Sequence, residues 1–202
     1  MAEANERRGG VSTEGGGGRL VRFAIRFYGV VAGIAVVWRL VAEGELPLHP
    51  PGGPRMGLGA AVVAGAVAAA AVIGISELVT ARSRIGRRLA IELASVLGPL
   101  SIREVAILAA VSGVAEEALF RGALQPRVGL VWASLLFGLA HLVPRRELLA
   151  WTAFALVAGF LLGALFEWTG QLAAPVVTHV LVNGVNLYRL QRFRRPGKAM
   201  RA

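Results

Sequence analysis

Cysteine is absent from the 202 residues, and charged residues make up only 17% of them. The missing cysteines exclude disulfides, a thiol nucleophile and thiolate metal ligands. Soluble domains carry about 25% charged residues, so the low charge, together with 55% hydrophobic residues, excludes an ordinary soluble domain. A Gly-x-Ser-x-Gly elbow and a His-Glu-x-x-His pair are also missing. The composition therefore indicates an integral membrane protein.

Acidic residues are few beside basic ones, with 12 Asp and Glu against 22 Lys and Arg and a formal net charge of +10. The arginines lie at the edges of apolar segments, as the positive-inside rule predicts. We therefore interpret the basic balance as a signal of membrane orientation, and no nucleic-acid partner is expected. A bilayer is the expected surrounding.

Six apolar stretches predict membrane-crossing helices, because about 20 such residues span the hydrocarbon. They cover residues 20–42, 56–76, 104–124, 128–143, 147–167 and 171–190. Residues 89–100 are apolar but short, and predict an interfacial helix that ends near Gly98 and Pro99. The predicted fold class is all-α: a polytopic helical membrane protein with about six transmembrane helices and one interfacial helix.

The chain divides into a membrane domain and two tails. Residues 1–18 are polar and Gly-rich and predict a disordered tail, residues 19–192 a membrane-embedded helical domain, and residues 193–202 a basic tail. Arginine clusters at 82–88 and 145–146 would lie on the same side as both termini, which predicts a cytoplasmic location for both. Residues 143–146 at that face would place the nearby His141 close to it.

Two arginines, Arg39 and Arg127, are expected near the opposite face of the predicted bundle. Arg39 is expected to snorkel from the end of the first span toward water. Arg127 does not follow the charge pattern, and nothing in the sequence explains it.

Ionisable side chains inside the apolar stretches are costly, and they point to function. Glu116, Glu117 and Arg121 fall within 104–124. On a helix Glu117 and Arg121 share a face and can form a pair, while Glu116 points about 100° away. This division predicts that Arg121 holds Glu117 ionised and that Glu116 takes a proton from water.

Two further motifs add imidazoles and an amide. His141 follows Phe137 by one turn, and His179 and Asn183 are four apart on one helix face. Glu116, His141 and His179 could hold a metal such as Zn²⁺ with an open water position. Without a metal, Glu116 and His141 could activate water while His179 and Asn183 bind the oxyanion. The sequence leaves both routes open. The third histidine, His49, lies in a Pro-rich loop and is assigned no role.

The ordered motifs Glu-Glu-x-x-x-Arg, Phe-x-x-x-His and His-x-x-x-Asn resemble those of the CPBP family, the CAAX-protease and bacteriocin-processing (abortive-infection-like) intramembrane proteases. The resemblance covers about residues 85–190. It implies an all-helical membrane core and hydrolysis of a peptide bond in a membrane-associated protein or peptide, by a metalloprotease or a glutamate-dependent protease. In eukaryotic relatives the substrate is prenylated, whereas prokaryotic members act on other peptides. A prokaryotic inner membrane is the expected location.

The resemblance and the residues together predict one catalytic set. Its members are Glu116, Glu117, Arg121, His141, His179 and Asn183. The alternative is a non-catalytic membrane immunity or scaffold protein with the same fold. A transporter or channel would place such residues along a path across the bilayer, not in one cluster.

Overall fold

The computed structural model describes residues 16–193, so the predicted tails lie almost entirely outside the described residues. The elements within this range are all helical. They are α1 (Gly16–Glu43), α2 (Leu58–Arg82), α3 (Arg84–Leu97), α4 (Ile102–Glu117), the π-helix η1 (Ala118–Leu124), α5 (Gln125–Ala140), the 3-10 turn η2 (Arg146–Leu148), α6 (Leu149–Thr169), α7 (Ala173–Leu190) and the 3-10 turn η3 (Gln191–Phe193). The predicted all-α class is confirmed.

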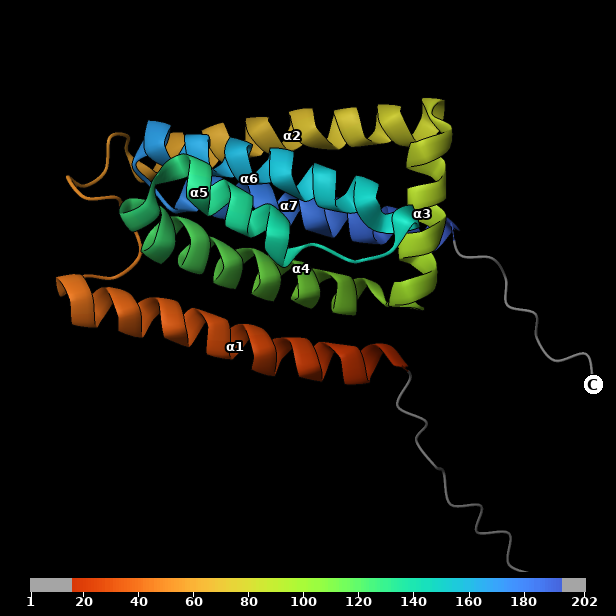
Figure 1. Cartoon of the computed structure of the whole chain (residues 1–202), viewed down its shortest axis with the longest axis horizontal. Coiled ribbons are helices and arrows are strands. Elements are labelled where there is room, and N and C mark those ends of the chain that lie inside the picture. Colours follow the sequence, from red (N-terminus) through yellow and green to blue (C-terminus); the bar gives the residue numbers. More distant parts are fainter. Residues whose placement is uncertain (1–15, 194–202) are drawn as a thin grey trace, which may run out of the picture.

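The helices α1, α2, α4, α5, α6 and α7 run lengthwise and alternate in direction, while α3 lies across one end of the bundle (Figure 1). We call that end the α3 end and the other the loop end. Both limits of the described chain lie at the α3 end (Figure 1). The outermost helix, α1, packs against α4 and η1, and α7 packs between α2 and α4.

Four stretches of the described chain are long and apolar enough to cross a membrane. They are Gly16–Glu43, Leu58–Arg82, Ile102–Ala140 and Arg146–Thr169. The third contains two lengthwise helices, because the chain turns back at η1 between α4 and α5 (Figure 1). The helix α7 is not among the four, so a count of six spans stays a prediction. The protein is an integral membrane protein built on these apolar helices.

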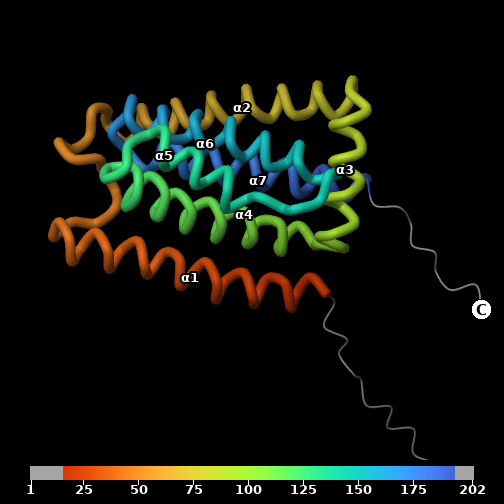
Figure 2. The backbone as a smooth tube through the Cα atoms, in the orientation of Figure 1, coloured from red at the N-terminus to blue at the C-terminus, as the bar shows by residue number. Residues whose placement is uncertain are grey.

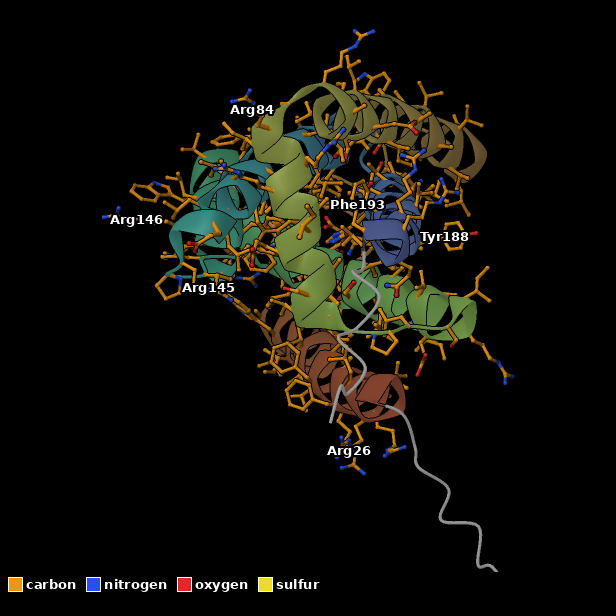
Figure 3. All side chains as sticks on the ribbon, turned by 90° about the vertical axis from the view of Figure 1, so that its right-hand side faces the viewer. Arg26, Arg84, Arg145, Arg146, Tyr188 and Phe193 are labelled. Atoms are coloured by element: carbon orange, nitrogen blue, oxygen red, sulfur yellow. The ribbon has the colours of Figure 1, made fainter. Side chains whose placement is uncertain are left out.

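The interfacial helix predicted over 89–100 is present as α3, but it begins at Arg84. The Ser83 side chain caps it by accepting a hydrogen bond of 2.8 Å from the Gly86 amide. It ends at Gly98, where φ is +68°, a conformation that glycine adopts at little cost. Seen from this end, the side chains of Arg26, Arg84, Arg145 and Arg146 point away from the bundle (Figure 3).

The fourth predicted span, residues 128–143, corresponds to α5, but the expected position of His141 close to one end of the bundle is wrong. The helix α5 contains a break at Gly129, where φ is +78°, and ends at Ala140. It ends about midway along the bundle, and the following segment runs on to the α3 end without forming a helix (Figure 2). His141, which follows α5 directly, therefore lies inside the bundle and not close to its end.

The loop end is held together by pairs that the sequence did not predict. Arg39 does not snorkel: it is fully buried, pairs with Glu43 and donates a 3.2 Å hydrogen bond to the His49 carbonyl. Arg127 pairs with the same Glu43 at 2.7 Å, which explains the one arginine that the charge pattern left unexplained. These contacts fasten the loop after α1 over the start of α5, while the His49 ring bonds the Gly170 carbonyl at 3.1 Å.

Small residues bring α7 close enough to its neighbours for side-chain hydrogen bonding. A Cβ on Gly113 of α4 would lie 2.7 Å from the Val180 Cγ2 atom of α7, so only glycine fits there. Against α2, the Thr178 hydroxyl donates a 2.9 Å bond to the Gly65 carbonyl. Membrane helices associate through close packing and interhelical hydrogen bonds, because the hydrophobic effect contributes little between helices that are surrounded by lipid.

Candidate active site

Four helices contribute to one polar cluster in the interior of the bundle. Glu116 and Glu117 end α4, Arg121 lies in η1, His141 follows α5, and His179 lies on α7. The chain changes from α- to π-helix directly after the two carboxylates. Such π segments are rare and occur often at functional sites.

Glu117 is the fully buried centre of the cluster. Its Oε1 atom accepts a 3.1 Å bond from Arg121 Nη1 and a 2.6 Å bond from His179 Nδ1. Arg121 is also buried, and its Nη2 donates to the Gly159 carbonyl of α6 at 3.0 Å. A carboxylate this deep needs a partner, since an unpaired buried charge is very unfavourable. The pair predicted between Glu117 and Arg121 is therefore present and joins α4, η1, α6 and α7.

Glu116 faces a different environment from its neighbour. Its Oε1 accepts a 2.8 Å hydrogen bond from the Tyr28 hydroxyl on α1. Its Oε2 lies 3.5 Å from His141 Nε2 and 4.0 Å from His179 Nε2. No group in the described part of the chain donates a hydrogen bond to Oε2, although that atom is buried. One oxygen is held and the other is left facing two imidazoles.

The hydrogen bonds of the two histidines fix which ring nitrogen carries the proton. His141 Nδ1 lies 2.8 Å from the Phe137 carbonyl, and His179 Nδ1 lies 2.6 Å from the Glu117 carboxylate. A carbonyl and an ionised carboxylate can only accept, so both Nδ1 atoms must donate. In the neutral form of each ring, the Nε2 atom directed at Glu116 therefore has a free lone pair.

An aromatic platform supports the charged groups. The Arg121 Cζ atom lies 4.3 Å from the centroid of the Phe137 ring. The centroids of the Phe137 and His141 rings are 4.5 Å apart. Its contact with the His179 ring is edge-on at 6.0 Å. A cation over an aromatic face is attracted by the ring quadrupole. Phe137 thus fixes the relative positions of residues from three helices, which explains its place in the motif.

Asn183 is the member of the predicted set that the structure holds apart from the carboxylates. Its Nδ2 donates a 3.1 Å bond to the Ser112 hydroxyl, one turn before Glu116 on α4. It lies one turn beyond His179 on α7, on the side of the α3 end (Figure 1). It therefore adjoins the cluster, and its hydrogen bond goes to Ser112 and not to Glu116 or Glu117.

Tyr28 is the site residue that the sequence analysis missed. It lies on α1, far from the three motifs, and contacts Glu116 across 88 positions of sequence. The signal available was weak: a phenol within an apolar span usually finds a hydrogen-bond partner. Nothing in the sequence says that the partner is Glu116.

The metal question was tested against the placement of the side chains. In donor chemistry, one carboxylate and two imidazoles with free Nε2 atoms suit Zn²⁺. In placement, no group of three or more His, Cys, Asp or Glu among residues 16–193 could hold a metal ion. Zn²⁺ at Glu116, His141 and His179 therefore stays a prediction from the sequence.

The fold and site define a class: an all-helical membrane protein with a buried cluster of carboxylates and imidazoles. Residues 98–185 match the family model described as type II CAAX prenyl endopeptidase Rce1-like. This segment contains all six predicted site residues, and the match confirms the resemblance to the CPBP family. The matched model describes a family of endopeptidases.

One curated relative is similar to this chain over part of its length. The protein named Uncharacterized protein YpbD, from Bacillus subtilis (strain 168), is 41% identical over 87 residues, which is 42% of this chain and 44% of YpbD. The alignment thus spans less than half of either protein. No solved structure matches the chain.

Proposed function

We propose that this protein is an intramembrane endopeptidase that hydrolyses a peptide bond of a membrane-associated protein or peptide. The observation that carries the proposal is the Glu116 Oε2 atom. It is buried, lacks a hydrogen-bond donor among the described residues, and faces the Nε2 atoms of His141 and His179 at 3.5 and 4.0 Å. If these three groups hold a water molecule, Glu116 Oε2 is in position to remove a proton from it.

The reaction would begin when Glu116 takes a proton from this water. The lone pair of His141 Nε2 accepts the second hydrogen of the water and orients its oxygen toward the substrate carbonyl carbon. The resulting C–O bond gives a tetrahedral intermediate with its charge on the former carbonyl oxygen. Glu116 then passes its proton to the leaving nitrogen as the C–N bond breaks, so protons and charge balance.

The charge that develops on the substrate oxygen needs donors. His179 is the first: its Nδ1 is held by Glu117, and a protonated ring would donate from Nε2. Asn183 is the second: it retains one amide hydrogen beyond its bond to Ser112. Arg121 does not contact substrate in this scheme. It pairs with Glu117 and holds that carboxylate in place, so its role is one of positioning.

Orientation follows from the charges at the two ends of the bundle. We place the α3 end in the cytoplasm of a prokaryotic cell, with the inner membrane around the lengthwise helices. Both limits of the described chain lie at this end, as both predicted cytoplasmic termini require (Figure 1).

The test uses the purified full chain in lipid vesicles with three peptides. One is a farnesylated CAAX peptide, one is the same peptide without the prenyl group, and one is an apolar transmembrane peptide. Mass spectrometry detects cleavage. Glu116→Gln keeps the size of the side chain but cannot act as a base, so hydrolysis should fall by about 10²-fold or more. Glu167→Gln is the matched control, because Glu167 accepts a hydrogen bond from Gln125 away from the cluster; it should retain full activity.

Two results would overturn the proposal. Full activity of Glu116→Gln would remove this carboxylate from the reaction. Three intact peptides, with a cellular effect that is equal in wild type and Glu116→Gln, would favour the non-catalytic immunity or scaffold role. Chelation followed by Zn²⁺ addition addresses the metal separately: the route above expects no change, and loss with restoration would assign the metal role to Glu116, His141 and His179.

A further inference from the structure

The helix α1 contributes a residue to the site although it lies outside the segment that the family model matches. Residues 98–185 begin after α1, α2 and α3 have ended. Yet the Tyr28 hydroxyl of α1 donates a 2.8 Å hydrogen bond to Glu116 Oε1. The bond crosses the packed interface of α1 with α4. α1 therefore does more than cover the bundle, because it supplies a partner to the carboxylate on which the proposed reaction depends.

Packing fixes the position of the Tyr28 ring. It lies against a hydrophobic cluster formed by α1, α4 and the segment just before α4. The cluster consists of Val21, Ala24, Leu100, Val105 and Leu108. Phe27 also contacts the ring, edge-on, with centroids 5.1 Å apart. With the ring held in this way, the hydroxyl has little freedom, and the carboxylate must come to it.

The consequence for Glu116 concerns which of its oxygens is free. A Glu side chain has three rotatable bonds, and its terminal torsion is broad, so an untethered carboxylate would sample many orientations. Tyr28 binds Oε1, whereas Oε2 has no donor in the described chain and faces His141 and His179. The phenol thus separates an anchored oxygen from a reactive one.

We propose that Tyr28 is a positioning residue for the base Glu116. The inference rests on the proposed function and deepens it: α1, outside the family-matched segment, completes the catalytic site. A general base contributes only when it is within reach of the proton it removes, and small misplacements are costly in rate. Loss of the phenol hydroxyl should therefore lower kcat. It should leave KM nearly unchanged, because in this scheme Tyr28 contacts Glu116 and not the substrate.

The test compares the two tyrosines of the chain, which are its only ones. Tyr28→Phe removes the hydroxyl and leaves the ring and its packing. Tyr188→Phe makes the same chemical change on an exposed part of α7, where the ring contacts the Arg192 side chain. With the peptide that wild type cleaves best, Tyr28→Phe should lose about tenfold or more in kcat, with KM within about twofold. Tyr188→Phe should match wild type.

A double-variant cycle shows whether Tyr28 acts through Glu116. Glu116→Asp shortens the side chain by one methylene and withdraws its oxygens from the Tyr28 hydroxyl. If the hydroxyl acts by positioning this carboxylate, Tyr28→Phe should have little further effect in the Glu116→Asp background, which is the non-additivity expected of contacting groups. Thermal melting of both single variants should stay close to wild type, which separates this role from one in folding.

The outcomes distinguish the inference from the proposed function. If wild type cleaves and Glu116→Gln does not, but Tyr28→Phe is as active as Tyr188→Phe, the inference fails and the proposed function stands. Losses that multiply in Tyr28→Phe/Glu116→Asp would also overturn it, because the hydroxyl would then act elsewhere. If wild type cleaves none of the peptides, the proposed function fails and the inference with it. A fall in kcat for Tyr28→Phe that is absent in the Glu116→Asp background is the result we expect.

Discussion

The buried pair between Arg121 and Glu117 allows the sharpest prediction about stability. Replacing Arg121 by leucine removes three contacts at once. These are the 3.1 Å pair with Glu117, the 3.0 Å bond to the Gly159 carbonyl, and the cation over the Phe137 ring. Leucine occupies most of the space but supplies no donor. Glu117, with 0% exposure, would then keep a single donor, His179.

The expected change in the free energy of unfolding depends on which charged partner remains buried, which here is Glu117. Breaking a buried pair by removing one partner costs about 3–5 kcal/mol, because the other charge stays unpaired out of water. We therefore expect Arg121→Leu to lower the free energy of unfolding by about 3–5 kcal/mol. Arg121→Lys keeps a positive charge beside Glu117 but cannot also reach Gly159 in the same fork geometry, so part of the stability and activity should remain.

The assay is reversible unfolding in mixed micelles at increasing fractions of sodium dodecyl sulfate, followed by tryptophan fluorescence. Arg127→Leu is the matched control, because Arg127 also pairs with a glutamate but is 26% exposed, with Glu43 at 28%. A pair at such a rim contributes about 0–1 kcal/mol. If Arg121→Leu unfolds at the same detergent fraction as wild type or as Arg127→Leu, the buried pair does not stabilise the fold as argued.

Two further predictions concern packing and orientation. Gly113→Leu should push α4 away from α7, since even a Cβ at this position would lie 2.7 Å from the Val180 side chain, so the variant should lose stability and activity. Gly33→Ala, on an open face of α1, should be neutral. Equal melting temperatures of the two variants would contradict the close approach of α4 and α7. The chain lacks cysteine, so single cysteines report sidedness. A membrane-impermeant thiol reagent should label Ser101→Cys at the α3 end only from the cytoplasmic side and Gly52→Cys at the loop end only from the other side; the reverse pattern would show that the orientation is inverted.

The sequence predicted the members of the cluster because the energetic cost of an ionisable side chain in an apolar stretch can be recognised from that stretch alone. A carboxylate or imidazole within an apolar stretch is unfavourable wherever the stretch packs, so Glu116, Glu117 and His179 could be singled out without knowing any neighbour. The pair between Glu117 and Arg121 was also predictable, because residues four apart on a helix face each other. The π-helical turn of η1 was not foreseen, but the pair forms across it.

What the sequence could not give depends on contacts between distant segments. Arg39 was expected to reach water, yet it is buried because Glu43 and the His49 carbonyl satisfy it inside the protein. His141 was placed near the membrane face because the arginines at 145–146 follow it closely and were assigned to that face. The break at Gly129 and the early end of α5 instead leave it midway along the bundle (Figure 2). Hydrophobic periodicity could not have prevented either error, because it shows neither which groups a side chain will contact nor where along the bundle a helix will end.

The early end of α5 is also what makes the cluster possible. Non-helical backbone at membrane depth is tolerated only where it is buried in protein or lines a polar cavity, because lipid cannot satisfy its hydrogen bonds. Here the chain leaves α5 at His141, the His141 carbonyl accepts a 3.2 Å bond from Thr152 of α6, and the imidazole faces Glu116. The irregular segment after α5 therefore holds the His141 imidazole beside Glu116 Oε2 while α6 satisfies the His141 carbonyl.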